Sequence, residues 1–216
     1  MAVRGGDPRS RLDDEEAMLD AQDRAEEFGC RPIDQVDGAA LRFLATALRA
    51  RTVVEIGTGA GVSGLWLLRG MAPDGVLTSI DIEPEHTRAA RAGFREAGYP
   101  PSRLRMINGM ALEVLPRLAD ATYDLVFIDS VIVEYPRYLT EAVRLLRPGG
   151  VIAMHGVLDV EAWAEPVRGG VPGQRLDPES QARREVLRAC QEHEDLVTLP
   201  LPLGAELLVA ARGNQD

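Results

Sequence analysis

Apolar and polar residues follow two alternating periods along most of this chain, one typical of strands and one typical of helices. Short apolar runs rich in β-branched residues recur, and behind each run apolar residues are spaced as on one face of a helix. The pattern predicts strands at about 52–56, 76–82, 104–107, 123–128, 151–155, 196–201 and 206–211, and helices at about 12–28, 34–49, 61–71, 83–97, 111–118, 138–146 and 179–193.

Alternating strands and helices of this kind form a mostly parallel sheet with helices on both faces. The last two strands are separated only by residues 202–205, too few for a parallel crossover, so they are expected to form an antiparallel hairpin at one edge. The predicted fold class is α/β: a Rossmann-like, doubly wound, mostly parallel seven-stranded sheet with an antiparallel C-terminal hairpin strand.

The chain length of 216 residues and a hydrophobic content of 45% suit one domain with a substantial core. Residues 1–11 are rich in Gly, Pro and charge, which predicts a flexible tail. Residues 12–216 are expected to form a single domain, with N-terminal helices in 12–50 and the Rossmann-like core in 51–216.

A glycine turn links the strand at 52–56 to the helix behind it. Gly57, Gly59 and Gly61 occupy every second position, where they allow unusual backbone torsions and a close approach of a ligand. The helix that follows offers unpaired N–H groups and the positive end of its dipole to an anionic group. The turn therefore predicts a site for the polar end of a nucleotide-like cofactor.

Two interpretations of this turn compete. Residues 59–64 fit the dinucleotide fingerprint G-x-G-x-x-G, and Asp81 follows about 20 residues later, as in an NAD(P)-dependent oxidoreductase. However, Gly57 already follows the strand, and Glu55 precedes it by two residues, which puts the fingerprint out of register. The pattern E-x-G-x-G-x-G, followed by a strand that ends in Asp, resembles the class I S-adenosylmethionine-dependent methyltransferases.

Five segments carry a narrower resemblance: V-V-E-I-G-T-G-A-G-V-S, D-I-E-P-E, A-L-E-V-L-P-R-L, Y-D-L-V-F-I-D and L-L-R-P-G-G-V-I. They resemble the O-methyltransferase family that includes catechol and caffeoyl-CoA methyltransferases, over roughly residues 30–212. The resemblance implies a single methyltransferase domain that uses the cofactor S-adenosyl-L-methionine and releases S-adenosyl-L-homocysteine. It also implies a small phenolic or catechol-like acceptor and a homodimer.

The resemblance also assigns residues to the cofactor. Asp81 would hold the ribose diol, and Asp129 would meet the methionine amino group. From the residues alone, Glu55 is equally compatible with a helix cap or ion pair, and Ser63 with an N-cap. The remaining cofactor-binding residues implied are Glu55, Gly57, Gly59 and Ser63 around the methionine end, Met110 and Ala111 at the adenine, and Val36 in the helix before the first strand.

The acceptor end departs from the family pattern. Metal-dependent members bind a divalent cation with an Asp after the fourth strand and an Asp-Asn pair after the fifth, assisted by a Lys. Here Asp129 is kept, but Ile132 stands at the Lys position, and His155 and Gly156 replace the pair. Because Mg²⁺ and Ca²⁺ prefer several oxygen ligands, no metal ligands are assigned.

His155 and Asp129 are therefore the predicted catalytic residues of a metal-independent O-methyl transfer. An imidazole titrates near neutral pH, so His155 is a candidate general base. The alternatives are a histidine bonded to a loop carbonyl, or a cofactor-binding protein that has lost catalysis. The acceptor is expected to meet residues 130–138 and 156–178, where Tyr135 or Trp163 would either stack on it or anchor its own loop.

The totals exclude several classes of function. A net charge of −10 repels a phosphate backbone, so no nucleic-acid partner is expected. No apolar run approaches membrane-spanning length, which predicts a cytoplasmic protein without a membrane partner. All 24 basic residues counted are Arg, which excludes a lysine base or Schiff base.

The remaining cysteines and histidines carry no predicted role. Cys30 and Cys190 match no metal or redox spacing and are interpreted as two reduced thiols. His86 and His193 lie on polar faces of predicted helices and are interpreted as solvated bystanders.

Overall fold

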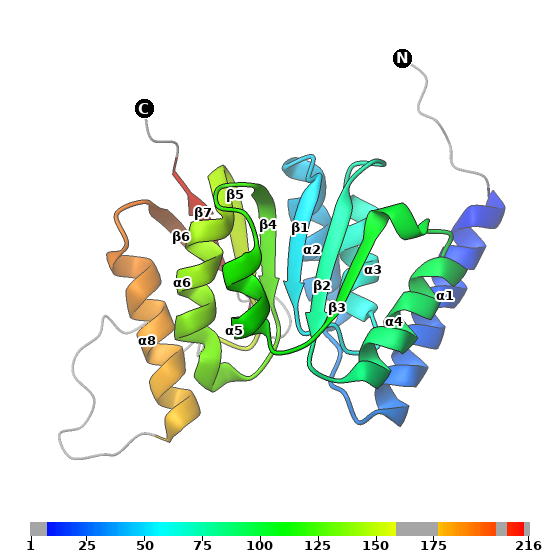
Figure 1. Cartoon of the computed structure of the whole chain (residues 1–216), viewed down its shortest axis with the longest axis horizontal. Helices are drawn as coiled ribbons and strands as arrows, with labels where there is room; N and C mark the ends of the chain where they lie inside the picture. Colours follow the sequence, from blue (N-terminus) through cyan, green and yellow to red (C-terminus); the bar gives the residue numbers. More distant parts are fainter. Residues whose placement is uncertain (1–7, 159–176, 202–206, 214–216) are drawn as a thin grey trace.

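All of the predicted strands form, and they join into one sheet (Figure 1). The structure is a computed structural model that describes residues 8–158, 177–201 and 207–213. The strands are β1 (Thr52–Ile56), β2 (Val76–Asp81), β3 (Leu104–Asn108), β4 (Tyr123–Ile128), β5 (Leu146–Met154), β6 (Leu196–Leu201) and β7 (Leu207–Arg212).

The order of the strands is β3-β2-β1-β4-β5-β7-β6. The first five strands pair in parallel, and β7 is antiparallel to both of its neighbours, β5 and β6. This confirms the predicted mostly parallel sheet with an antiparallel hairpin strand at one edge.

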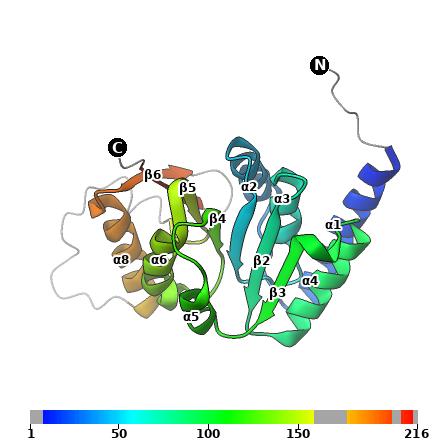
Figure 2. The same cartoon turned by 45° about the horizontal axis from the view of Figure 1, so that its top comes forward.

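Helices cover both faces of the sheet, as Figures 1 and 2 show. Three single turns of 3-10 helix lie in the connections: η1 (Pro101–Arg103), η2 (Leu115–Arg117) and η3 (Ile132–Glu134). The described α-helices are α1 (Pro8–Glu27), α2 (Gln35–Ala47), α3 (Val62–Gly70), α4 (Pro84–Glu96), α5 (Ala111–Val114), α6 (Tyr135–Leu145) and α8 (Pro178–Glu192). None of them is long and apolar enough to cross a bilayer.

Alternate strand residues point to opposite faces of the sheet and so build two cores. Val54 and Ile128 belong to the apolar cluster formed with α5, α6 and α8. Their neighbours Val53 and Phe127 belong to the cluster formed with α1, α2, α3 and α4. Since both faces are buried, the central strands are mostly apolar, as is typical of parallel strands, although β1 also carries the buried Glu55.

Four elements differ from the sequence prediction. The helix α6 begins at Tyr135, because Pro136 is tolerated in a first turn, where its missing N–H is not needed. The strand β5 begins at Leu146, across a register shift opposite Tyr123 and Leu125. The helix α1 begins at Pro8 rather than at residue 12, and the helix expected at 111–118 is divided into α5 and η2.

The carboxyl ends of β1, β2, β4 and β5 lie at one edge of the sheet. Ile56 is level with Ile80 and Ile128, and Ile128 is level with Met154. The strand order reverses between β1 and β4, which is where doubly wound sheets bind ligands. The residues that follow these strand ends are therefore brought to a common site.

Candidate active site

The three glycines of the turn have different environments. A Cβ on Gly57 would lie 1.8 Å from the carbonyl oxygen of Asp129, and one on Gly61 would lie 3.0 Å from the Cβ of Ala90. A Cβ on Gly59 would meet no described atom within 4 Å. All three have positive φ angles, of 91°, 50° and 97° in chain order. Two of the glycines thus permit close packing within the protein, and Gly59 faces open space that a ligand can approach.

Asp81 at the end of β2 is fixed against the glycine turn. Its Oδ2 accepts hydrogen bonds from the backbone N–H groups of Thr58 and Gly59, both at 2.9 Å. Its Oδ1 accepts one from the N–H of Glu83 at 2.8 Å. The carboxylate is only 9% exposed, so the turn holds a nearly buried negative charge at the mouth of the sheet.

Glu55 lies beneath the turn in a fully buried network. Its Oε1 accepts a hydrogen bond from the Ser63 hydroxyl at 2.6 Å, and its Oε2 accepts one from the Ser79 hydroxyl. Burial raises the pKa of Glu55 to about 7, although the two hydroxyl groups partly offset this. Glu55 is thus neither a cap nor an ion-pair partner, and Gly61, not Ser63, is the N-cap of α3.

A cavity of about 240 Å³ opens at the ends of β1, β2 and β4 and beside Met110. Four predicted cofactor residues line it: Gly57, Asp81, Met110 and Ala111. A further hollow of about 330 Å³ runs along α4 and contains none of the predicted residues. We therefore assign the site to the smaller cavity, which lies at the switch point of the sheet.

The mouth of this cavity is apolar. Ile82, Met110, Val131 and Val133 all line it, and each side chain remains 45–60% exposed. Exposed apolar side chains gathered around one cavity indicate a surface that a ligand covers. Val131 and Val133 belong to the segment that follows β4.

The two predicted catalytic residues are in contact. His155 Nδ1 lies 3.0 Å from Asp129 Oδ1, at adjacent strand ends. His155 Nε2 lies 3.5 Å from Asp37 Oδ2 and has no hydrogen-bond partner among the described residues. Burial alone would lower the pKa of His155, but the hydrogen bond to Asp129 and the nearby negative charges raise it.

Asp37 was not predicted from the sequence, although a signal was present. It lies on α2 and is only 1% exposed, and it faces the same way as Leu41, one helical turn further on. An acidic residue on the apolar stripe of a helix indicates a buried partner, which here is His155. Val36, one residue earlier, is 49% exposed and does not line the cavity.

Tyr135 anchors the strand ends instead of offering its ring to a ligand. It is 1% exposed, and its hydroxyl lies 3.0 Å from the carbonyl oxygen of His155 and 3.3 Å from that of Ile128. The N–H of Ser130 donates to the same hydroxyl. Trp163, the other aromatic residue predicted to meet the acceptor, lies outside the described residues.

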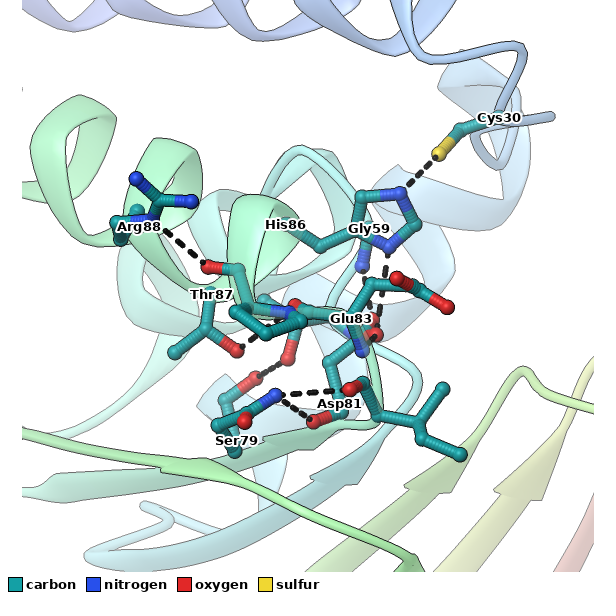
Figure 3. A network of polar contacts seen from close by, with 12 residues as sticks. Cys30, Gly59, Ser79, Asp81, Glu83, His86, Thr87 and Arg88 are labelled. Carbon is teal, nitrogen blue, oxygen red and sulfur yellow. Dashed lines mark hydrogen bonds and ion pairs between the residues drawn. The ribbon is translucent and has the colours of Figure 1, made fainter.

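His86 is a site residue that sequence reasoning missed. It was interpreted as a solvated bystander, but its side chain is 21% exposed and its Nδ1 lies 3.3 Å from Asp81 Oδ1 (Figure 3). Its Nε2 lies 3.4 Å from the Sγ of Cys30. The polar pattern of α4 carried no sign of this, because the contact depends on how the segment 28–30 packs over the helix.

The fold and this cavity define a methyltransferase of the Rossmann-like class, with a glycine turn after β1 and an acid at the end of β2. Residues 23–181 match the model of the O-methyltransferase family. The chain belongs to that family, which confirms the predicted enzyme class and decides against the oxidoreductase interpretation of the glycine turn.

Individual relatives agree with this assignment. A Mycobacterium tuberculosis protein named as the probable O-methyltransferase Rv1220c is 51% identical over 195 residues, which are 90% of this chain and 84% of that protein. A Corynebacterium glutamicum crystal structure shares 34% identity with a TM-score of 0.81, covering 93% of this chain and 91% of the other. The O-methyltransferase TomG of Streptomyces achromogenes, crystallised with S-adenosylmethionine, shares 28% identity with a TM-score of 0.79, covering 92% and 90%.

Proposed function

We propose that this protein transfers a methyl group from S-adenosylmethionine to a hydroxyl of a small phenolic or catechol-like acceptor, without a divalent metal and with His155 as general base. The observation that carries the proposal is the contact of His155 with Asp129 at the ends of β4 and β5. The homodimer and the cytoplasmic location remain predictions of the sequence.

The cavity beside the glycine turn fits the cofactor. Asp81 would meet the ribose diol, Met110 and Ala111 the adenine, and Asp129 the methionine amino group, while Gly59 leaves space for the cofactor at the turn. When bound, S-adenosylmethionine supplies a methyl group on a sulfonium, and S-adenosylhomocysteine is left after transfer. The protein then has to orient the acceptor oxygen in line with that methyl group and to accept the proton of the acceptor hydroxyl.

The residues at the acceptor end do not fit a magnesium or calcium site. Asp129 is the one carboxylate kept from the family's ligand set, and it is already hydrogen-bonded to His155. Among the described residues, no three His, Cys, Asp or Glu side chains are grouped so that they could hold a metal ion. Hard cations require several oxygen ligands, and this donor set offers too few.

His155 is suited to accept the acceptor's proton. Asp129 holds Nδ1 and so orients the ring, which leaves Nε2 as the nitrogen without a hydrogen bond. Asp37 Oδ2 lies 3.5 Å from this nitrogen as an ion-pair partner, and a buried nitrogen that makes no hydrogen bond calls for a functional explanation. The raised pKa makes the neutral imidazole a stronger base than a free histidine, although it forms only at higher pH.

The apolar mouth favours an aromatic acceptor. Val131 and Val133 flank the cavity next to Asp129, and they present apolar surface where the charged carrier of an acyl thioester would need polar partners. A phenol ring covers such side chains favourably and leaves its hydroxyl at the polar strand ends.

The test is a turnover assay with S-adenosylmethionine against a panel of phenols, catechols and hydroxylated acyl thioesters. We expect turnover of a phenol or catechol to be unchanged by a chelator. His155→Ala should lower kcat by about 10²- to 10⁴-fold. His193→Ala is the matched control, because that ring accepts a hydrogen bond from the N–H of Asp195, beyond α8.

Three results would contradict the proposal. If the chelator abolishes turnover, the enzyme depends on a metal ion. An unimpaired His155→Ala variant at every pH would remove His155 from the chemistry. Binding of S-adenosylhomocysteine without turnover of any panel member would favour a cofactor-binding protein that has lost catalysis.

A further inference from the structure

A chain of three side chains leads from the glycine turn to the connection between α1 and α2. Asp81 Oδ1 contacts His86 Nδ1 at 3.3 Å, and His86 Nε2 contacts Cys30 Sγ at 3.4 Å, as Figure 3 shows. His86 lies in the first turn of α4, and Cys30 follows α1. The ring of Phe28 packs on His86 with the ring centroids 5.5 Å apart. The ring of His86 is thus contacted at both of its nitrogen atoms and by the ring of Phe28.

The chemistry of the neighbours assigns the hydrogen atoms of this chain. A carboxylate only accepts hydrogen bonds, so Nδ1 must carry the hydrogen that points to Asp81. Burial and the negative charges of two aspartates raise the pKa of Cys30, so its sulfur is a protonated thiol. The thiol can therefore donate to Nε2 when the ring carries its one hydrogen on Nδ1.

Among the residues that the structure describes, His86 is the one whose side chain hydrogen-bonds to the Asp81 carboxylate. The other three donors are the backbone N–H groups of Thr58, Gly59 and Glu83. These backbone groups belong to the glycine turn after β1 and to the loop after β2. His86, in contrast, links the carboxylate to α4 and to the segment 28–30. A second-layer donor of this kind orients a carboxylate that touches a ligand.

We propose that His86 is a positioning residue for the cofactor: its Nδ1–H holds the Asp81 carboxylate in place for the ribose diol, and Cys30 fixes the tautomer of its ring. This inference rests on the proposed function, because it takes Asp81 as the ribose-binding acid. It gives the N-terminal helix pair a part in cofactor binding, although neither helix lines the cavity.

Two substitutions distinguish the hydrogen bond made by Nδ1 of His86 from the one made by Nε2. The side-chain amide of His86→Asn reaches about as far as Nδ1 and can still donate to Asp81, whereas that of His86→Gln reaches about as far as Nε2. We expect His86→Gln to weaken the binding of S-adenosylhomocysteine about fivefold, since one hydrogen bond to Asp81 is lost. His86→Asn should bind within about twofold of the wild type. Titration calorimetry of the full-length protein measures both.

A ligand without the ribose diol provides the second readout. For a 2′,3′-dideoxy analogue of S-adenosylhomocysteine, His86→Gln and the wild type should bind equally, because Asp81 then has no hydroxyl to meet. Nitrogen chemical shifts of the His86 ring should report a protonated Nδ1 and an unprotonated Nε2. Cys30→Ser should preserve this tautomer, because a hydroxyl also donates.

The outcomes separate the inference from the proposed function. If Asp81→Asn weakens S-adenosylhomocysteine binding but His86→Gln binds like the wild type, the positioning role is overturned and the function stands. If both His86 variants weaken binding equally, or if the loss persists with the dideoxy analogue, the residue acts only through packing and the inference is overturned. If Asp81→Asn itself binds normally, the assignment of the ribose to Asp81 fails, and the inference fails with it.

Discussion

The proposed cofactor half of the site and the proposed acceptor half are held in place by different kinds of interaction. The cofactor half consists of the glycine turn with Asp81 and Glu55, and backbone N–H groups and buried hydroxyls fix its carboxylates. The acceptor half consists of Asp129, His155 and Asp37, in which the His155 side chain contacts both aspartates. A geometry fixed by the backbone survives most side-chain changes, whereas one fixed by a few side chains changes with each of them.

The difference accounts for where this chain departs from the family pattern. The glycines and Asp81 are tied to torsions, packing and N–H groups that only a few residue types satisfy. At the acceptor half, a histidine and a glycine stand in place of the Asp-Asn pair, and the strand β5 still ends at Met154 beside β4. The fold thus allows the acceptor chemistry to change without rebuilding the cofactor half.

The largest expected effect tests whether backbone packing at the glycine turn holds the cofactor half in place. We expect Gly57→Ala to lower the free energy of unfolding by about 3 kcal/mol or more, because its Cβ would overlap a backbone carbonyl. Gly59→Ala is the matched control, and it should lose only about 1–2 kcal/mol from its positive φ. Urea unfolding measures both losses of stability. Equal losses would show that Gly57 is no more tightly packed within the protein than Gly59.

The buried Glu55 should make the stability depend on pH. Its folded pKa of about 7 exceeds the reference value of 4.5, so its contribution to stability is complete below pH 4.5 and is lost as the pH rises through 7. The loss amounts to about 3 kcal/mol, because the free energy follows the difference between the folded pKa and the reference pKa at about 1.36 kcal/mol per tenfold change in the acid constant.

Urea unfolding of the wild type and of Glu55→Gln across this range measures that loss. The difference in unfolding free energy between the two proteins should change in favour of Glu55→Gln as the pH rises, since the amide stays neutral. A difference that does not depend on pH would mean that Glu55 keeps one charge state throughout.

The acceptor half should respond through the pH dependence of its rate. The raised pKa of His155 means that its base form appears only as the pH rises, so log(kcat/KM) should increase with pH through that pKa. Asp37→Asn removes one negative charge that favours the imidazolium, and the rising limb should therefore move to lower pH.

The control for this shift is Asp74→Asn, which changes an exposed surface pair with Arg51. Its pH profile should match that of the wild type. A limb that stays in place in Asp37→Asn, or a rate that falls as the pH rises, would contradict the assignment of His155 as the base.

The smallest expected effect concerns the mouth of the cavity. Val131→Ser and Val133→Ser each remove apolar surface that the acceptor would cover, and the KM for the best phenol of the panel should rise about three- to tenfold. Val197→Ser on the edge strand β6 is the matched control, because Val197 is 70% exposed and away from the site. A rise in the KM for S-adenosylmethionine of equal size would mean that these valines serve the cofactor instead.

Much of the cofactor half could be predicted from the sequence because its signals are local. The β-branched run, the spaced glycines and the acid two dozen residues later all lie within one strand-turn-helix-strand unit, residues 52–81. The expectation that Gly57, Asp81, Met110 and Ala111 gather at one site agrees with their place around one cavity. The local pattern did not show that Glu55 is fully buried or that its carboxyl group is hydrogen-bonded to Ser79 from the next strand.

The class of fold and the family follow from the sequence alone, because strand and helix periods, turn chemistry and motif order are properties of consecutive residues. The partners of the isolated polar residues depend on how the folded chain packs. Asp37 meets His155, and Cys30 meets His86, across separations that no periodicity spans. Such pairs form where the sheet and its helices bring distant segments together, and their charges and hydrogen bonds exist only in the packed molecule.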